Sequence, residues 1–479
     1  MGNLVGILFA SSIVLMLVTP MLSVPVTADG YSVRYDTALD TWDSLAERDQ
    51  FCIVNYQDGV EKMIVQIRLD GPEVRSSDKI AWLFPIPAAP ESVSLKHFQT
   101  VPRFAGDSQG SVVLDKTADS LSWGYAFATQ LYALPIVLLG GYVMVLGFGT
   151  SSGGADQVES YAVLDQYGVT SEVLHANSSE ALSAYLTSKG LTLPEMAEGA
   201  LDYYLGGDYS IVLSWISNVP SFLSKALKVP DTNDYSLGIG VEFPCDEIFF
   251  PLKMTSAYGE LEIPITVQVL DYVTPDEYPS GGNLDFSCKY RVQDTYAPLI
   301  GGLWNYDYQL VSRINITEGR EEFEYFFAEQ IAAQGSVYLK GVDYTVVNFD
   351  GPAAELTEDL WLSDSPPLRV SSLKFVGDNP WLVTLAVVIL VSCVSSLIAC
   401  AVVLGWNARF MRTFILLGLF NVASIFGYYC AYMDLVKPRL KRENVDVEGK
   451  GLRLMAMFSA LFIVQLASVY LCFFHGPTV

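Results

Sequence analysis

The most apolar stretches of the chain lie near its two ends. Residues 1–28 contain no charged side chain, and Leu4–Val24 is a long hydrophobic run. The run is followed by Val26-Thr27-Ala28, whose short side chains suit the cleavage site of a signal peptide. The pattern predicts a signal peptide over residues 1–28 that is cleaved before Asp29. Because no Lys or Arg precedes the run, an uncleaved membrane anchor is the alternative.

Three further hydrophobic runs, at residues 381–404, 414–433 and 454–474, contain no Asp, Glu, Lys, Arg or His. The first has 24 residues, about 36 Å as a helix, which exceeds the roughly 30 Å of a hydrocarbon core. Trp381 and Trp406 flank it, as is typical of membrane interfaces. The pattern predicts a C-terminal bundle of three transmembrane helices. Since none of these five residue types lies inside the runs, a proton pump or ion-coupled transporter is disfavoured.

A few polar and small residues stand out within these runs. Asn421 and Gln465 would lie at similar depth in antiparallel neighbouring helices, so we predict an interhelical polar pair, a hydrogen bond worth about 0.6 kcal/mol. Ser392, Ser396 and Cys400 recur at every fourth position of the first run. Small side chains let a neighbouring helix approach closely, so these positions predict the packed face of the first helix.

The residues between the two ends contain several β-like patterns. Phe51–Val54 and Met63–Leu69 flank Asp58-Gly59, which is a hairpin signal. Ala81–Pro87 is predicted as an edge strand or a strand end, because proline cannot donate a ladder hydrogen bond. Further strands are predicted at residues 209–216, 236–243, 248–254, 261–272, 308–314 and 337–349.

Helical patterns interrupt these strands. Asn177 is the expected N-cap of a helix that ends at Gly190, and Thr192–Glu195 opens a second helix directly afterwards. Another helix is predicted over residues 321–333. The fold class that follows is α+β: an exported domain over residues 29–370, mostly antiparallel β with a helical hairpin.

Residues 120–155 interrupt this domain with a stretch that contains no charged side chain. Pro135 and Gly140-Gly141 break its most apolar part. A single crossing would place the residues before and after it on opposite sides of a membrane. We therefore predict an apolar insertion that dips into the membrane and returns. A buried hairpin of the soluble core is the alternative.

The distribution of charge indicates what kind of surface residues 29–380 have. The chain has 28 Lys and Arg against 53 Asp and Glu, a formal net charge of −25. Residues 29–380 hold 49 of the acidic and 20 of the basic side chains, so the surplus negative charge lies there. So acidic a chain repels nucleic-acid backbones, which excludes nucleic acid as a partner. The pattern is typical of a solvated surface, and no calcium-loop motif supports a cation-binding face.

The basic residues near the C-terminus conflict with the simplest topology. With the acidic block outside and three crossings, the turn at 407–413 is inside with two basic side chains. The loop at 434–453 is then outside with six, although the positive-inside rule prefers the opposite arrangement. The signal and the acidic surface still favour the block outside. We predict a multi-pass protein of the cell membrane with its large domain extracytoplasmic.

Several short motifs follow one another along the exported domain: Ala28-Asp29-Gly30, Ala81–Pro87, Val173–Ala176, Leu182, Tyr185-Leu186, Leu193-Pro194, Phe249–Thr255 and Leu356–Leu360. In this order they resemble an uncharacterised domain-of-unknown-function family of exported, often membrane-tethered prokaryotic proteins with a Trp-x-x-Pro-x-Pro motif. The resemblance covers residues 29–365 and implies one continuous domain without catalytic residues. The chain departs from the family at the 120–155 insertion and in having three C-terminal runs where one is usual.

The sequence contains no recognisable catalytic, cofactor-binding or metal-binding motif. The histidines His97, His175 and His475 stand apart, with no His-x-x-x-His or Cys-x-x-Cys pair. No nucleophile elbow, phosphate-binding loop or dinucleotide fingerprint occurs. The acidic residues of 318–329 suit a solvated helix face better than a catalytic carboxylate pair. We therefore expect no catalytic, cofactor or metal site and no enzyme activity.

Two kinds of modification are predicted for an exported domain. Cys52, Cys245 and Cys288 allow one bridge and leave one thiol over, and Cys245–Cys288 is the predicted disulfide because it is the closest pair. Asn177 and Asn315 stand in glycosylation sequences. Asn315 is the better candidate, since capping by Asn177 would compete with a glycan.

These observations predict a non-enzymatic, membrane-anchored cell-surface protein whose acidic ectodomain binds a partner or contributes to the cell envelope. An accessory or sensory subunit of a membrane complex is the alternative, because simple tethering needs one crossing and three are predicted. The expected partners are the lipid bilayer and a protein partner or a second copy of the chain, bound through the transmembrane helices.

Overall fold

The computed structural model describes the chain in segments: residues 31–36, 41–45, 50–76, 79–99, 101, 103–130, 163–192, 194–228, 233–277, 284–293, 326–328, 342–405, 432–442 and 448–474. These segments belong to two compact units. The β unit contains the described residues of 31–109, 163–293 and 326–370. The helical unit contains those of 110–130, 371–405 and 432–474.

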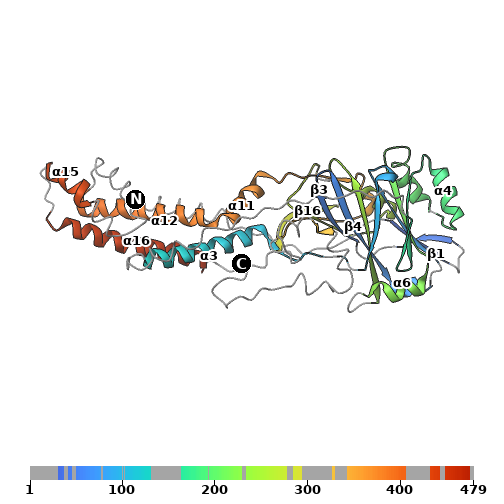
Figure 1. Cartoon of the computed structure of the whole chain (residues 1–479), viewed down its shortest axis with the longest axis horizontal. Helices are drawn as coiled ribbons and strands as arrows, with labels where there is room; N and C mark the ends of the chain where they lie inside the picture. Colours follow the sequence, from blue (N-terminus) through green and yellow to red (C-terminus); the bar gives the residue numbers. More distant parts are fainter. Residues whose placement is uncertain are drawn as a thin grey trace. The chain divides into compact units, whose positions relative to one another are not determined.

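The β unit is built on two large sheets (Figure 1). Sheet A has the order β2-β1-β5-β10-β9-β8, with bounds Thr41–Ser44, Tyr31–Asp36, Ile80–Ile86, Ser210–Ile216, Val169–Leu174 and Val163–Gln166. Sheet B has the order β11-β12-β4-β3-β14-β17-β16-β7, with bounds Leu227–Lys228, Asp234–Pro244, Val60–Asp70, Gln50–Gln57, Ile265–Leu270, Val342–Asp350, Asp285–Gln293 and Asp107–Ser108. β6 (Ser94–Phe98) also pairs with β12.

A small third sheet has the order β13-β18-β15, with bounds Ile248–Phe250, Leu360–Ser363 and Thr274–Pro275. Short helices connect the strands: α2 Gly71–Ser76, η1 Pro90–Ser92, α4 Ser179–Ser188, α5 Glu195–Leu201, α6 Val219–Lys225, α7 Leu252–Thr255, η4 Ser256–Tyr258 and η5 Ala353–Glu355. Among the named strand pairings β3 with β14 is parallel and the others are antiparallel. The predicted α+β class with mostly antiparallel sheets is confirmed.

The β3–β4 hairpin follows the sequence prediction closely. Asp58 and Gly59 have φ of 53° and 79°, the left-handed pair that a two-residue hairpin turn of type I′ requires. The strands pair antiparallel from this turn through Phe51↔Gln66. Met63, at an odd position of β4, is fully buried. The period-two pattern therefore gave the correct inward face of this strand.

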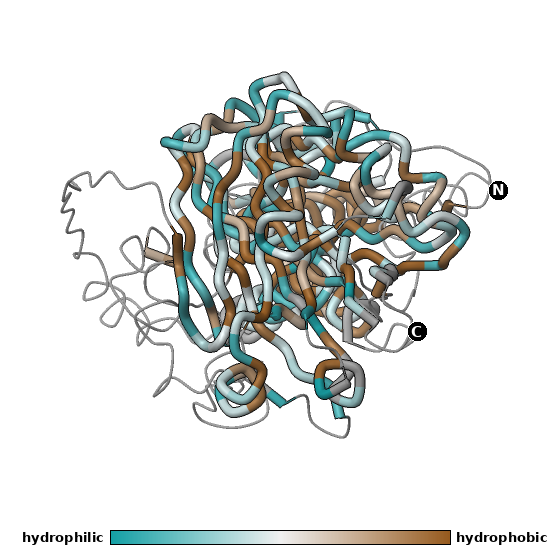
Figure 2. The backbone as a smooth tube through the Cα atoms, turned by 90° about the vertical axis from the view of Figure 1, so that its right-hand side faces the viewer, coloured by the Kyte–Doolittle hydropathy of each residue, from teal (hydrophilic) through white to brown (hydrophobic). Residues whose placement is uncertain are grey.

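The main hydrophobic core contains residues of both large sheets. Met63 and Val65 of β4 belong to the same buried cluster as Val33 of β1 and Ile211 of β10. Figure 2 shows hydrophobic and hydrophilic positions following one another along the strands. Burial of this apolar surface is the main force that holds the two sheets together.

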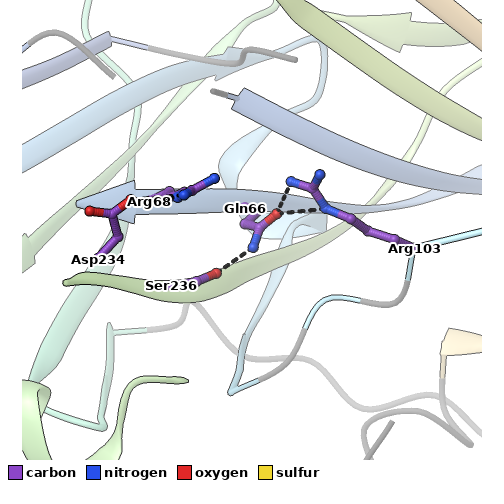
Figure 3. A network of polar contacts seen from close by, with 5 residues as sticks. All are labelled: Gln66, Arg68, Arg103, Asp234 and Ser236. Atoms are coloured by element: carbon purple, nitrogen blue, oxygen red, sulfur yellow. Dashed lines mark hydrogen bonds and ion pairs between the residues drawn. The ribbon is translucent and has the colours of Figure 1, made fainter. Parts of the chain in front are cut away.

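The opposite face of sheet B carries a second buried cluster, covered in part by residues 103–108, which we call the strap. Phe104 of the strap donates its N–H to the Gln268 side chain at 2.9 Å and accepts from that amide at 2.8 Å, as a neighbouring strand would. Gly106 donates to the Tyr344 hydroxyl at 2.7 Å. Arg103 donates to the Gln66 side chain (Figure 3). Side chains therefore hold the part of the strap that precedes β7.

Gln66 belongs to a polar network on that face of sheet B (Figure 3). Its amide also donates to Ser236 on the neighbouring strand β12. Two residues further along β4, Arg68 pairs with Asp234 at 2.8 Å, and the Asp234 side chain is 3% exposed. Such cross-strand polar pairs fix the register of β4 against β12.

Of the two alternatives predicted for Ala81–Pro87, the edge strand is wrong, whereas Pro85 and Pro87 do lie at the end of strand β5, which stops at Ile86. β5 lies inside sheet A, between β1 and β10. Its proline is tolerated because β1 pairs only with residues 80–83 of β5, whereas β10 continues to pair through Pro85 and Ile86. At Pro85 the strand has one neighbour, so the missing N–H interrupts no second ladder.

The predicted Cys245–Cys288 disulfide is not formed, and both residues are free thiols. Cys245 directly follows β12, whereas Cys288 lies in β16. Four strands separate β12 from β16 in sheet B, which corresponds to about 24 Å along the sheet at roughly 4.8 Å per strand. A disulfide requires Cα atoms within about 7 Å. Proximity in sequence was misleading because the sheet order places other strands between them.

The two predicted helices of the hairpin begin later than expected. Ser178, not Asn177, is the N-cap of α4, and its hydroxyl accepts from the Ala181 N–H at 3.3 Å. Pro194 is the N-cap of α5 and offers no side-chain acceptor. The helix predicted over 321–333 is described only at residues 326–328, and the strand predicted over 308–314 lies outside the described residues.

Candidate functional site

The helical unit contains two helices that are long and apolar enough to cross a membrane. α12 (Pro380–Leu404) has proline at its first position and is followed by Gly405, whose φ of 81° suits a helix end. α16 spans Lys450–Phe474, and its apolar part is Lys450–Leu471. These helices correspond to the first and third predicted runs.

The second predicted run, at 414–433, lies outside the described residues except for its last two. Those two open the π-helical turn η7 (Tyr432–Val436), which continues into α15 (Lys437–Arg442). Tyr432, Val436 and Leu440 are buried in the same cluster as residues of α12 and α16. This segment is therefore packed into the helical unit.

A third long helix, α3 (Gln109–Gln130), runs parallel to α11 (Leu368–Asp378) and α12. A β-carbon on Gly377 would come within 2.9 Å of Val113, and the hydroxyls of Ser120 and Thr384 are 2.7 Å apart. The sequence separation is 264 in both pairs, so the two helical stretches advance in the same direction.

This helix bears on the predicted insertion at 120–155. Residues 120–130 form the second half of α3 and belong to the helical unit, so they are not part of the β-unit core. Residues 131–155 lie outside the described residues. Sequence reasoning missed α3 because it treated the whole uncharged stretch as one insertion.

α12 and α16 run antiparallel. The Ser395 hydroxyl of α12 donates to the Gln465 side chain of α16 at 3.2 Å. Tyr125 of α3 stacks on Tyr470 with ring centroids 5.1 Å apart, one turn beyond the contact of α3 with Thr384. The contacts near Thr384 of α12 therefore involve Tyr470 of α16, whereas Ser395, further along α12, contacts the earlier residue Gln465. The contacts move forward along α12 and backward along α16, so the two helices are antiparallel.

The predicted polar pair Asn421–Gln465 is only partly described. Asn421 lies outside the described residues, and Gln465 accepts its hydrogen bond from Ser395. Sequence reasoning recognised Gln465 as a helix-contact residue and did not identify this partner. Ser395 is next to Ser396, which belongs to the predicted packed face, and this position could have indicated Ser395 as a partner of Gln465.

The polarity of these helices is inverted relative to a water-soluble helix. Ser392, Ser396 and Cys400 are fully buried, which confirms the predicted packed face of α12. Leu390 of α12 is 63% exposed and Val464 of α16 is 62% exposed. A helix that buries serine and exposes leucine and valine suits a lipid environment, where small and polar side chains hold helices together.

His97 on β6 lies at the centre of a polar chain within the β unit. Its Nε2 is 2.8 Å from the Ser171 hydroxyl, and its Nδ1 is 3.2 Å from the Gln166 carbonyl oxygen. Since a carbonyl only accepts, Nδ1 carries the proton and Nε2 accepts from Ser171. The Ser171 hydroxyl in turn lies 2.7 Å from that of Ser214.

The His97–Ser171 pair is shielded from solvent, so its role is structural. His97 is 1% exposed and Ser171 is fully buried. Burial lowers the pKa of His97 to about 4, so its ring is neutral near pH 7. A serine sealed from solvent cannot meet a substrate, and the chain of hydrogen bonds instead joins β6 of sheet B to β9 and β10 of sheet A.

Glu61 on β4 is a fully buried carboxyl group. One oxygen accepts from the Phe249 N–H at 2.8 Å, and the other has no hydrogen-bond partner among the described residues. Burial raises the pKa of Glu61 well above its usual range, so the group is protonated near pH 7. The sequence held a signal for it, because Glu61 shares the odd, inward positions of β4 with Met63.

A third polar cluster surrounds Asp359, just before β18. The Tyr204 hydroxyl and the Lys253 N–H donate to the same carboxylate oxygen at 2.7 and 3.0 Å. Burial raises the pKa of Asp359, and the hydrogen bond from Tyr204 opposes this. The Lys253 ammonium lies 3.6 Å from the ring centroid of Tyr203, which is 56% exposed. The cluster offers a cation and an exposed ring, which suit binding to a polar partner.

The predicted modification sites differ in how the structure describes them. Asn177 is exposed, and since Ser178 caps α4, no capping role competes with a glycan on Asn177. Asn315 lies outside the described residues. His175 is exposed and bonds the Tyr209 carbonyl at 3.1 Å. Within the described part of the chain, no three His, Cys, Asp or Glu side chains are placed to share a metal ion.

Comparison with known proteins gives no match: no family model, curated protein or solved structure is similar to this chain. The resemblance to the Trp-x-x-Pro-x-Pro family stays a prediction.

Proposed function

We propose that this protein is a non-enzymatic, membrane-anchored cell-surface protein whose acidic β unit is displayed outside the membrane. There it binds a partner or contributes to the cell envelope. The observation that carries the proposal is the inverted polarity of α12 and α16. In water, the exposed apolar side chains of both helices would be unfavourable, whereas in a bilayer they face lipid.

Extraction of membranes from cells that express the full-length chain tests this proposal. We expect the protein to stay in the membrane pellet after washes with high salt and alkaline carbonate and to be released only by detergent. A peripheral protein would be released by the washes. Recovery in the soluble fraction at physiological salt would contradict the proposal.

A second candidate is an accessory or sensory subunit of a membrane complex. The observation that favours it is α3, a helix from the middle of the chain that packs on α12 and α16. Both α3 and α11 begin in the β unit and continue in the helical unit, and the Gln109 side chain of α3 donates to the Val370 carbonyl of α11 at 2.9 Å. Simple tethering needs only one such connection.

Photo-cross-linking separates the two candidates. A photoreactive amino acid at Leu390, which is exposed on α12, should capture a membrane protein if the helices assemble with one. The same group at Val388, which is 8% exposed, is the matched control and should capture only other parts of the chain. Capture of lipid alone from Leu390 favours the first candidate. Capture of a second copy of the chain identifies a homo-oligomer.

A further inference from the structure

The charged side chains of the helical unit are distributed unequally between its two ends. The end where α12 begins carries the described residues Lys116, Lys374, Asp115, Asp119 and Asp378. The described residues from η7 to the first turn of α16 include the basic Lys437, Arg439, Lys441, Arg442, Lys450 and Arg453 and the acidic Asp434 and Glu448. The end where α12 begins therefore has a net charge of −1, and the residues around α15 and the start of α16 have a net charge of +4.

The antiparallel packing of α12 and α16 places this basic group. Because the helices run in opposite directions, Gly405 after α12 and Lys450 at the start of α16 lie at the same end of the helical unit. Arg442 at the end of α15 is six residues before Glu448, a span of at most about 22 Å. Figure 1 shows α15 at the end where α16 begins. The basic side chains therefore gather at the end opposite the start of α12.

The same packing fixes how the chain crosses a membrane between α12 and α16. Three successive crossings would make the first and the third helix parallel. The observed antiparallel pair requires that the chain leaves and returns on the same side between Gly405 and Lys450. In that arrangement the six described basic residues between Lys437 and Arg453 lie on the side where α12 ends.

We infer that α12 and α16 cross the membrane as an antiparallel pair and that the basic end binds the anionic lipid headgroups of the cytoplasmic leaflet. Arg439, Lys441, Arg442 and Arg453 are exposed at that end and available to phosphate groups. The cytoplasmic leaflet is the negatively charged one, and basic residues near helix ends orient membrane proteins toward it. The conflict with the positive-inside rule disappears, while the acidic β unit, which precedes α12, remains outside.

This inference rests on the membrane location proposed above, and cysteine labelling of the full-length protein tests the orientation. The native cysteines are replaced by serine or alanine, and either Ser217→Cys in the β unit or Glu448→Cys at the basic end is added; both positions are exposed. We expect a membrane-impermeant maleimide to label Ser217→Cys on intact cells and Glu448→Cys only after permeabilisation.

Each other outcome has a distinct meaning. Labelling of both positions on intact cells would overturn the inferred orientation and leave the proposed function standing. Labelling of Glu448→Cys alone would place the β unit inside and overturn both. If the cysteine-free background does not reach the membrane, an epitope tag after Val479 on the native chain gives the same decision. The antiparallel pair predicts that antibody reaches this tag without permeabilisation, and a tag reached only after permeabilisation would overturn the inference.

Lipid nanodiscs test the headgroup contact. The full-length protein should unfold at a higher temperature in discs that contain phosphatidylglycerol than in pure phosphatidylcholine, and high salt should remove the difference. The triple variant Arg439→Gln/Lys441→Gln/Arg442→Gln should lose most of this shift. The control Lys225→Gln/Lys228→Gln, in the β unit, should retain it. Equal unfolding temperatures of the native protein in both lipids would overturn the headgroup contact.

Discussion

His97 and Glu61 are two titratable side chains that the β unit keeps uncharged by burial. Burial lowers the pKa of the histidine and raises that of the carboxyl group. Each group therefore makes the free energy of unfolding depend on pH, with opposite signs. These two residues carry the clearest predictions at the scale of single side chains.

Acidification is expected to destabilise the β unit through His97. Between its unfolded pKa of 6.5 and its folded pKa of about 4, the unfolded state binds more protons, so stability rises with pH in this window. The gap corresponds to about 3 kcal/mol. Hydrogen exchange of β6 and β9 between pH 4 and 7, corrected for intrinsic rates, measures it. The variant His97→Gln should lose this part of the pH dependence, and identical slopes would contradict the prediction.

Glu61 should act in the opposite direction. Its folded pKa lies above the usual 4.5, so the folded state keeps a proton that the unfolded state loses, and stability falls as pH rises through the folded value. Glu61→Gln keeps an acceptor for the Phe249 N–H without the titration, so it should be the more stable protein at pH 9. Glu61→Ala removes the acceptor and should be less stable than Glu61→Gln by about 1–3 kcal/mol at every pH. Unfolding midpoints of the three proteins from pH 5 to 9 check this.

Residue-level predictions from sequence succeeded where local chemistry decided the outcome and failed where the sheet order did. Asp58-Gly59 needed only its own backbone preference to specify a turn. Cys245 and Cys288 looked close along the chain, but intervening strands that come from other parts of the sequence separate them. Glu61 was identifiable from its position in an alternating pattern, whereas the partners of His97 lie 74 and 69 residues away.

At the scale of elements, the strap depends on a glycine. A β-carbon on Gly106 would overlap the Val292 carbonyl of β16, whereas nothing lies within 4 Å of one on Gly110 at the start of α3. Gly106→Ala should therefore destabilise the β7–β16 pairing by about 1–3 kcal/mol. Gly110→Ala should be neutral or stabilise the helix by up to about 1 kcal/mol. Hydrogen exchange of β7 and β16 distinguishes them, and equal protection in both variants would argue against a strap held by close contact.

The Ser395–Gln465 hydrogen bond should contribute to the packing of α12 on α16. A double-mutant cycle with Ser395→Ala and Gln465→Leu, measured by unfolding in detergent, is expected to give a coupling of about 0.6 kcal/mol. Ser468 bonds to the Val464 carbonyl of its own helix, so Ser468→Ala should be additive with Ser395→Ala. Strict additivity in the first pair would mean that the contact carries no energy.

Helices and strands were predictable from sequence where a single hydrophobic pattern continued over the whole element. The β3–β4 hairpin has a clear turn signal, and the odd positions Met63 and Val65 of β4 face the main core, as their period-two spacing predicts. β5 contains Pro85, and only the short reach of β1 along it makes that proline acceptable inside a sheet. α3 begins among charged residues and ends among apolar ones, so its two halves gave different patterns although they form one helix.

At the scale of the whole molecule, the helical unit is assembled from distant parts of the chain. Residues 110–130 pack with α12 and α16, which follow more than 240 residues later. No periodic pattern within a short window can reveal such a partnership. The sequence predicted long apolar helices in the C-terminal part and did not indicate that α3 packs with them.

An engineered disulfide tests this assembly. Ser120→Cys with Thr384→Cys replaces two hydroxyls that are 2.7 Å apart, so mild oxidation of native membranes should join α3 to α12. Ser122 bonds to the Ala118 carbonyl of its own helix, and Ser122→Cys with Thr384→Cys is the control that should remain unlinked. Mass spectrometry of the linked peptides gives the yields, and comparable yields would contradict specific packing of α3 on α12.

The buried serines of α12 also set an order of events during synthesis. α16 begins 46 residues after α12 ends, since Lys450 follows Leu404 by that number. At roughly 5–20 residues per second, a ribosome needs a few seconds to make the intervening chain. During this time Gln465 has not yet been synthesised, and the Ser395 hydroxyl can bond to a carbonyl of the preceding turn of its own helix. In the proposed membrane location, α12 would thus insert as an independent helix first, and α16 would complete the pair afterwards.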